Sequence, residues 1–425
     1  MIIDILVVAV AAFAAFAWGS NEPWAMGIIA IATFALLAAR LVWDAWRRGL
    51  KIPRSTIYIP LIGFLIYGAV QLGVKTAEPY STTLYLLLAL SYVSIVFLTE
   101  NGFRSRKLVK ALVISIIVLG IVEAVYGLVQ FLGGYDYIWW YAKLADQGIA
   151  TGTLINRNHY ALLVNLCICT GLGYLYYRSV RLLEGEEPTL RGVISSPGAG
   201  KLAWIILWLG LMGFALIFSM SRMGIAAMLC AIGVMIVAGK TAESGRRTAA
   251  IGTLLLFAIL GLAVYTGIDE VLVRYENIWK ERQSDKDRVA LWQDAWKMIQ
   301  KQPAFGQGLG TFRWTYPAYE STEPDTPANY AHSDYLQVLA EVGIVGLGLL
   351  LWAFGAAWRV AVKNLRYGHD PLVRGIGLGT IGALTAIALQ EITDFGLYMP
   401  GVAVIAAVLV GLNFRAREPA RPRPA

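Results

Sequence analysis

Residues 108–132 read LVKALVISIIVLGIVEAVYGLVQFL, and this stretch indicates the class of fold that the chain adopts. As a helix rising about 1.5 Å per residue, it covers the roughly 30 Å hydrocarbon core of a bilayer. A basic cluster, Arg104 with Arg106 and Lys107, comes directly before it. Working outward, other stretches are apolar and long enough, or nearly so, to cross in the same way: residues 2–18, 24–45, 58–74, 82–98, 159–178, 202–220, 223–239, 249–268, 335–360, 372–390 and 398–414. The chain is therefore predicted to be an all-α polytopic membrane protein with about 12 transmembrane helices.

The composition excludes an ordinary soluble domain. Hydrophobic residues make up 57% of the chain and charged residues only 15%, against about 25% charged in typical soluble domains. The first apolar run has no basic segment before it and is followed by further spans, so we expect it to remain in the protein rather than to be cleaved as a signal peptide. Cys167, Cys169 and Cys230 fall within apolar runs and are predicted to be small core residues, not disulfides or metal ligands.

The basic residues alternate between the two ends of the predicted spans. Of the 36 Lys and Arg, 24 lie on the side that holds the connections after even-numbered spans and both termini. By the positive-inside rule, this side is cytoplasmic. The net charge of +8 therefore reflects membrane topology, and we expect no nucleic acid as a partner.

The other twelve basic residues lie on the opposite side, and eight of them fall in one connection between the ninth and tenth spans. That concentration runs against the general charge bias, so this connection is the candidate functional region. It divides the chain into four predicted regions: residues 1–267 with transmembrane helices 1–9, residues 268–333 as a large periplasmic loop, residues 334–414 with helices 10–12, and residues 415–425 as a basic cytoplasmic tail.

Inside the loop, residues 287–301 predict an amphipathic helix. Its apolar face is expected to carry Leu291, Trp292, Ala295, Trp296 and Ile299. The glycine run 305–310 follows but lacks the preceding strand and the Lys-Ser/Thr of a phosphate-binding loop, so a turn in which backbone approaches a neighbour is favoured. Asp285-x-Asp287 resembles a metal-binding aspartate pair. A solvated helix cap is favoured instead, because Lys286 lies between the carboxylates and no His is near.

Two ionisable residues stand at predicted membrane boundaries on the side of the loop. His332 comes just before Asp334, which suits a helix start with Gln337 three residues on. A neutral imidazole with an ordinary pKa near 6.5 can accept a proton at physiological pH, whereas the alternative is a structural His bonded to backbone. Arg222 has almost no loop to hold it in water, which favours a functional group over one that merely extends to the interface.

Five motifs occur in order along the chain: Gly152-Thr153-Leu154-Ile155-Asn156-Arg157-Asn158-His159, Ser221-Arg222-x-Gly224, Arg288-x-x-x-Trp292, Pro303-x-x-Gly306-x-Gly308-Leu309-Gly310-x-Phe312 and Ala331-His332-Ser333-Asp334-Tyr335-Leu336-Gln337. Together they resemble the O-antigen ligase and O-antigen polymerase family of bacterial envelope glycosyltransferases. The resemblance covers most of the chain from about residue 150, and the N-terminal spans match only in topology.

The resemblance implies an enzyme of the multi-spanning lipid-sugar glycosyltransferase type in the bacterial inner membrane, with its active site facing the periplasm. Its donor would be a glycan on undecaprenyl pyrophosphate and its acceptor a sugar hydroxyl of lipid A-core or of another lipid-linked glycan, with no metal or other cofactor. By motif position, the essential arginines and histidine of the ligases correspond to Arg222, Arg288 and His332. Guanidinium groups suit this chemistry because they compensate charge on the leaving phosphates, while His332 would take the proton of the acceptor hydroxyl in an inverting transfer.

Further substrate-binding candidates are Arg157, His159, Arg313, Asn156, Tyr335 and Trp292. Trp292, with Trp296, Trp314 and Tyr316, is expected either to stack on sugar rings or to pack the loop on the membrane surface. Ser333 stands where many family members have an asparagine. If that asparagine orients the imidazole, Ser333 or Asp334 must do so here.

Two alternatives to ligation remain open from the sequence. The loop 268–333 carries eight Lys and Arg against ten Asp and Glu, which slightly favours a polymerase of O-antigen or exopolysaccharide over a ligase that binds phosphorylated lipid A-core. A transporter of lipid-linked sugar is disfavoured, because the chain shows no internal repeat and transport does not require so long an external loop.

Overall fold

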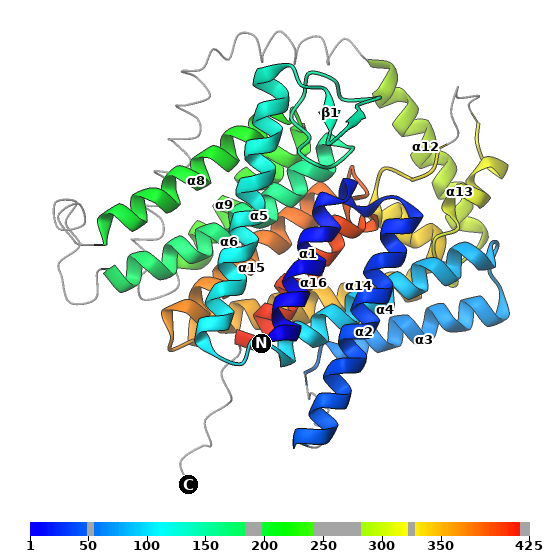
Figure 1. The fold of residues 1–425 in the computed structure, drawn as a ribbon. Helices are drawn as coiled ribbons and strands as arrows, with labels where there is room; N and C mark the ends of the chain where they lie inside the picture. Colours follow the sequence, from blue (N-terminus) through cyan, green and yellow to red (C-terminus); the bar gives the residue numbers. More distant parts are fainter. Residues whose placement is uncertain (49–54, 183–197, 241–281, 322–327, 417–425) are drawn as a thin grey trace.

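The computed structural model describes residues 1–48, 55–182, 198–240, 282–321 and 328–416 (Figure 1). Within these ranges, eight helices are long and apolar enough to cross a membrane, and three shorter apolar helices accompany them. The all-α polytopic class is therefore confirmed. These eleven helices coincide with eleven of the predicted spans, whereas the predicted span 249–268 lies outside the described residues, so the total of twelve stays a prediction.

The elements fall before and after the segment 241–281. Before it come α1 (Ile2–Phe16), η1 (Trp18–Ser20), α2 (Pro23–Arg48), α3 (Tyr58–Val74), α4 (Pro79–Asn101), α5 (Arg106–Gly133), the antiparallel strands β1 (Tyr137–Ile138) and β2 (Tyr141–Ala142), α6 (Arg157–Leu182), α8 (Ala199–Phe218) and α9 (Arg222–Lys240). After it come α12 (Arg282–Lys301), α13 (Phe312–Thr315), η2 (Tyr316–Ala318), α14 (Asp334–Tyr367), α15 (Pro371–Gln390), η3 (Gly396–Tyr398) and α16 (Pro400–Ala416).

Helices α6 and α15 form the centre of the molecule. In the apolar 18-residue stretch of each helix, 94% of the residues of α6 and 78% of those of α15 are buried, against 28% for α2. They approach through glycines. A Cβ on Gly173 or on Gly375 would strike the carbonyl oxygen of the other residue, and a Cβ on Gly379 would lie 2.8 Å from the Cys169 carbonyl oxygen. Small residues at these positions let the two backbones touch, as is common between membrane helices.

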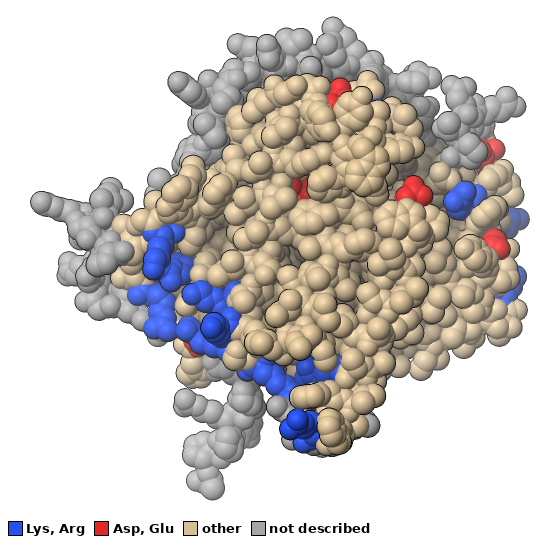
Figure 2. Space-filling view, in the orientation of Figure 1, with Lys and Arg blue, Asp and Glu red and all other residues tan. Residues whose placement is uncertain are grey.

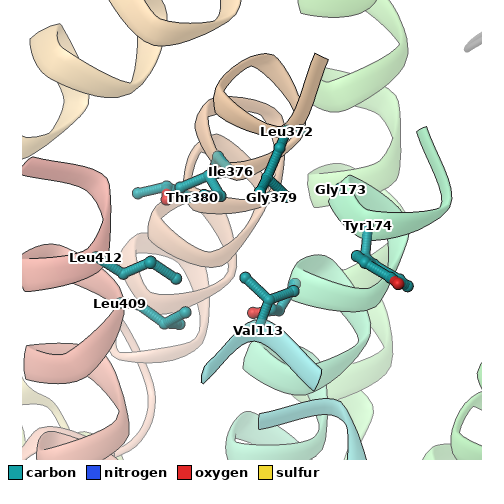
Figure 3. Close-up of a pocket in the computed structure, with 11 residues that line it drawn as sticks. Val113, Gly173, Tyr174, Leu372, Ile376, Gly379, Thr380, Leu409 and Leu412 are labelled. Carbon is teal, nitrogen blue, oxygen red and sulfur yellow. Dashed lines mark hydrogen bonds between the residues drawn. The ribbon is translucent and has the colours of Figure 1, made fainter. Parts of the chain in front are cut away.

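A hollow of about 10 Å³, about the size needed for one water molecule, lies at this centre (Figure 3). Figure 3 shows that it lies between α15, α6, α5 and α16, with Ile376, Thr380, Gly173, Val113 and Leu409 among its lining residues. Around this hollow the described part of the centre is a close-packed scaffold that holds the helix ends in place.

The cysteines divide between core and surface. Cys167 and Cys169 on α6 are buried, as predicted, but Cys230 on α9 is exposed, so the prediction of a core position was wrong for it. An apolar helix at the edge of a membrane protein turns apolar side chains to lipid. Hydrophobicity alone therefore does not separate its buried face from its exposed face.

Helix α14 is broken at Gly343, whose φ of 61° and ψ of −170° lie outside the helical region. The glycine run after α12 fills the break. The amides of Gln307 and Gly308 donate to the carbonyl oxygens of Ala340 and Glu341 at 2.9 and 2.8 Å, replacing the bonds that a continuous helix would form. The predicted turn in which backbone approaches a neighbour is confirmed.

The carboxyl group of Glu341, buried beside this break, binds the next part of the loop. It accepts hydrogen bonds from the amides of Gly310 at 2.8 Å and Phe312 at 3.1 Å, and from the hydroxyl of Tyr398 at 2.6 Å. Gly310 has a φ of +74°, and a Cβ there would strike the ring of Tyr85. The loop that carries α12 and α13 is therefore attached to the start of α14 by buried hydrogen bonds.

Candidate functional site

His332 lies directly before α14, at the point where the long connection returns to the transmembrane helices. Its φ of 47° is in the left-handed region, which is uncommon for a residue with a side chain. Two contacts hold the preceding residue: the indole of Trp292 on α12 donates to the carbonyl oxygen of Ala331 at 3.0 Å, and the amide of Ala331 donates to the side chain of Gln337 at 2.9 Å. The position of His332 is thus set by α12 on one side and α14 on the other.

The ring of Phe395, in the turn after α15, connects the two histidines that the sequence places on this side. The ring of His159 meets it edge to face at 4.6 Å and 83°, and the ring of His332 does so at 4.9 Å and 85°. The ring of Tyr330 stacks on Phe395 at 4.3 Å and 13°. A single aromatic ring therefore brings together residues from α6, the end of the loop and the α15–α16 turn.

Three carboxyl groups surround this aromatic cluster. Asp394 Oδ1 lies 3.5 Å from His159 Nε2, and both side chains are nearly fully buried. The amide of Asp334 donates to the carbonyl oxygens of Glu391 and Asp394 at 3.1 and 2.8 Å. Burial, followed by the adjacent Asp334 carboxyl, raises the pKa of Glu391 well above its usual range. The turn 391–396 is therefore an acidic, buried support for the start of α14.

Several polar atoms at this support are buried without a hydrogen-bond partner among the described residues. They are His159 Nε2, His332 Nδ1 and both carboxylate oxygens of Asp394, whereas the carboxyl groups of Asp334 and Glu391 are hydrogen-bonded to each other. Because buried polar groups in proteins are generally hydrogen-bonded to protein or to ordered water, these four atoms are candidates to bind water or a substrate group. Neither Ser333 nor Asp334 forms a hydrogen bond with His332 Nδ1, and a role for either residue in orienting the imidazole stays a prediction.

Arg288 lies on α12, partly exposed, in the electrostatic neighbourhood of His332. Burial of the imidazole and then the charge of Arg288 lower the pKa of His332 to about 4, while Asp394 opposes the shift. The imidazole is consequently neutral at physiological pH, which is the form that accepts a proton. Two of the three predicted catalytic residues thus lie near one another.

Arg222 and Arg157 are each the first residue of a helix, and the two helix starts are connected. The Ser221 hydroxyl donates to the side-chain oxygen of Asn158 at 2.9 Å, and the side-chain amide of Gln390 donates to the Asn158 carbonyl oxygen at 2.7 Å. Arg157 also lies 3.6 Å from Asp146 in an ion pair. The starts of α6 and α9 therefore meet the end of α15, next to the acidic turn.

The remaining predicted binding residues have contacts of their own. Arg313 is exposed and lies 5.0 Å over the ring of Trp314, and Tyr335 donates its hydroxyl to the Ala388 carbonyl oxygen at 2.8 Å. The side-chain oxygen of Asn156 accepts from the amide of Asn158 at 2.7 Å, a cap at the start of α6. These contacts give Tyr335 and Asn156, like Trp292, a role in positioning the backbone.

The amphipathic helix predicted at 287–301 is confirmed as part of α12, with Leu291, Ala295 and Ile299 buried. Trp296 is half exposed instead of buried, so that part of the prediction was wrong. Met298 takes the inner position. The side chains of Asp285 and Asp287 lie outside the described residues.

The sequence reading assigned no role to Phe395, Tyr330 or Asp394. The signal for Asp394 was present in Gln390-Glu391-x-x-Asp394, a polar run at the end of an apolar stretch. Nothing in the pattern pairs this run with His159, because the contact forms only when α6 and α15 pack. Within the described residues, no group of three or more His, Cys, Asp or Glu is arranged to hold a metal ion.

Comparison with known proteins shows a match between residues 207–351 and the family model described as O-antigen ligase. The matched segment runs from α8 into the second half of α14, so it contains Arg222, Arg288 and His332. No curated protein matches the chain. The family match supports the resemblance to the O-antigen ligase and polymerase family, and with it a glycosyltransferase of that general type in a multi-pass membrane protein.

Proposed function

We propose that this chain, which carries the O-antigen ligase segment, moves a glycan from undecaprenyl pyrophosphate to a hydroxyl of an acceptor sugar. The observation that carries the proposal is the position of His332, half-buried directly before α14, within the electrostatic influence of Arg288 on α12. A proton acceptor next to a fixed positive charge suits the displacement of a phosphate leaving group by a hydroxyl.

In the proposed reaction, the acceptor oxygen forms a bond to the anomeric carbon of the donor glycan. The bond from that carbon to the phosphate oxygen breaks, and its electron pair leaves with undecaprenyl pyrophosphate. His332 takes the hydroxyl proton, and the single displacement inverts the anomeric centre. Arg288 and Arg222 compensate the charge on the leaving pyrophosphate, and no metal is needed for that role.

The low pKa of His332 makes it a weak base when no substrate is bound. Part of this depression comes from the charge of Arg288. A bound pyrophosphate would offset that charge, so the pKa of His332 would rise towards its ordinary value as the donor binds. Donor binding would therefore prepare the base, and Asp394 would stabilise the imidazolium that forms.

Helix starts add to the anion site. Arg157 and Arg222 stand at the first positions of α6 and α9, where free amides and the helix dipole favour negative charge. We assign Arg157 and Arg313 to contacts with phosphate or sugar around the central pair. His159 belongs to the same site through Phe395 and Asp394.

The orientation of the site follows from charge. Figure 2 shows a band of Lys and Arg along the end of the molecule where Figure 1 places the N-terminus and the C-terminal end of α2. The β1–β2 hairpin lies at the opposite end. By the positive-inside rule the basic band faces the cytoplasm, so the hairpin and the proposed site face the periplasm of a bacterial inner membrane.

The acceptor decides between two activities. We place ligation to lipid A-core first on the strength of the two arginines and the histidine, with polymerisation of lipid-linked repeat units almost equally supported by the net negative charge of the predicted loop. Transport of lipid-linked sugar is the weaker candidate. The broken helix α14 has its free backbone groups bonded to the loop of the same chain rather than directed into a cavity.

The test uses purified protein with lipid-linked glycan and either lipid A-core or a second lipid-linked unit. Replacing Arg288 or His332 by Ala should reduce transfer at least about 100-fold, the usual scale for losing a charge-stabilising or acid–base group, without removing the protein from the membrane. Lys301→Ala, an exposed cation on the same helix, is the control. Unchanged transfer by both site variants would refute the site, and longer lipid-linked chains without transfer to lipid A-core would refute ligation.

A further inference from the structure

A cavity of about 550 Å³ lies between the α1–α2 turn and the β1–β2 hairpin. Its wall is unusually aromatic for a surface hollow, with Trp18, Trp24, Trp140 and Tyr141 among the lining residues. All of them precede residue 207, where the matched family segment begins. The cavity is therefore a feature that the family segment does not explain.

The rings are arranged with open faces. Trp18 meets Trp140 edge to face at 5.5 Å and 85°, and meets Trp24 at 6.0 Å and 81°. Trp140 is 77% exposed, Tyr141 60% and Trp24 49%. An edge-to-face contact covers one face of only one ring in each pair, and the exposed fractions show that ring surface remains for a ligand to stack on.

The cavity wall is held rigidly, although its aromatic rings are exposed. Trp18 and Ser20 both have left-handed backbone, with φ of 53° and 56°, and the Ser20 hydroxyl donates to the Ala14 carbonyl oxygen at 3.0 Å. The indole of Trp139 donates to the Phe16 carbonyl oxygen at 2.8 Å, which attaches the hairpin to α1. Strained residues held in this way are typical of preformed ligand sites.

The charges around the cavity select the ligand. The ammonium group of Lys143 is bonded to the Ile149 carbonyl oxygen at 2.6 Å, and burial lowers its pKa. Glu22 is exposed on the lining, and Asp136 and Asp146 lie close enough to act on Lys143. An anionic ligand would meet carboxylates here, and a hydrocarbon chain would strip water from Glu22 without replacing its hydrogen bonds. An uncharged sugar satisfies both conditions, because its C–H faces stack on indole and its hydroxyls donate to the carboxylate.

The cavity also adjoins the candidate site. Ile155 lines it, and the next two residues along the chain are Asn156 and Arg157 at the start of α6. Asp146, one residue beyond the lining segment 143–145, pairs with Arg157. A glycan whose phosphate end lay at the arginines would thus have the cavity beside its sugar end.

We propose that the cavity binds an uncharged stretch of the glycan handled at the candidate site, through stacking on Trp140, Trp24 and Tyr141 and hydrogen bonding to Glu22. The proposal rests on the proposed function for its ligand class. The glycan comes from either the donor or the acceptor, and both sources present the same sugar chemistry. The cavity would then set which glycans the protein accepts.

The probes are two oligosaccharides released by mild acid from the producing cells, one from the lipid-linked glycan and one from lipid A-core. Each carries a fluorescent tag, and binding to the full chain in nanodiscs is followed by anisotropy, since maltoside detergents would themselves supply a sugar. We expect one of the two to bind and Trp140→Ala to weaken it about tenfold, the scale of one lost aromatic stacking contact. Trp140→Phe, which keeps a ring face, should bind within about twofold of the unchanged protein. The matched control is Trp46→Ala, which removes an indole of nearly equal exposure, 78%, at the other end of α2 and should change nothing.

Absence of binding by either oligosaccharide, or equal binding by Trp140→Ala and the unchanged protein, would overturn the proposal. A second result would also overturn the proposal: brominated acyl chains quench the fluorescence of Trp140, and adding the oligosaccharide does not reduce this quenching. Lipid would then occupy the cavity. Arg288→Ala should lose transfer but keep this binding. Binding that depends on Trp140, together with no transfer by the unsubstituted protein, would refute the proposed function alone. Transfer by Trp140→Ala with an unchanged KM would refute the cavity proposal alone.

Discussion

Replacing Glu341 by Ala should release the loop that carries α12 and α13 from the break in α14. Its carboxyl group is the acceptor for the amides of Gly310 and Phe312 and for the Tyr398 hydroxyl, all in a region closed to water. Each buried amide left without an acceptor costs about 1–3 kcal/mol. Removing the acceptor of both amides should therefore lower the free energy that holds the loop against α14 by about 2–6 kcal/mol, before any contribution from the Tyr398 hydroxyl.

Hydrogen–deuterium exchange followed by mass spectrometry in nanodiscs measures this loss where it occurs. The peptide containing residues 306–315 should exchange at least about 30-fold faster in Glu341→Ala, which is the lower bound of about 2 kcal/mol expressed as an opening constant. Glu341→Gln retains one side-chain oxygen, so the exchange rate of this peptide should lie between the rates in Glu341→Ala and in the unchanged protein. Peptides from α6 and α15 should not change, because their packing does not involve this carboxyl group.

The control is Ile344→Ala, directly after Gly343, which truncates a side chain that is 58% exposed and keeps the backbone bond from its amide to the Pro303 carbonyl oxygen. It should leave the exchange of the loop as it was. Unaltered exchange of residues 306–315 in Glu341→Ala would refute the reasoning, because the remaining hydrogen bonds of the loop, such as those from Ala77 to Gln307 and from Trp314 to Ser81, would then hold it without this carboxyl group.

Two further predictions concern the candidate site. NMR of labelled imidazoles should give His332 a pKa near 4, and Arg288→Gln should raise that pKa because a like charge is removed. The unfolded imidazole takes up its proton near pH 6.5 but the folded one only near pH 4, so the free energy of unfolding should fall as the pH drops from 6.5 to 4. A His332 pKa at or above 6.5 in the unliganded protein would contradict this account. Trp292→Phe removes the donor to the Ala331 carbonyl oxygen and should destabilise the protein by about 0.5–1.5 kcal/mol. Because this bond holds the residue before His332, kcat should fall more than KM changes. An unchanged kcat would show that the bond does not position His332.

Local patterns determined much of this protein because the bilayer acts on each span separately. Every apolar stretch within the described residues is a helix, since hydrocarbon leaves the backbone no other partner than its own chain. The amphipathic pattern of 287–301 predicted α12, and the glycine run predicted an approach of backbone to backbone. Trp296 and Cys230 were misplaced, because periodicity shows that a helix has an apolar face but not which structure, or which lipid, covers it.

Only the tertiary structure decided what surrounds His332. The sequence singled out His332, Arg288 and Arg222 by residue type and by order, but it contains no information that Phe395 contacts both His159 and His332, or that Asp394 lies beside His159. The contacts of His159 join segments more than two hundred residues apart, and they form where glycines let α6 and α15 pack backbone to backbone. Membrane thickness sets the length of each helix, whereas the site depends on which helix ends come together, and the packing and hydrogen bonding between helices determine that.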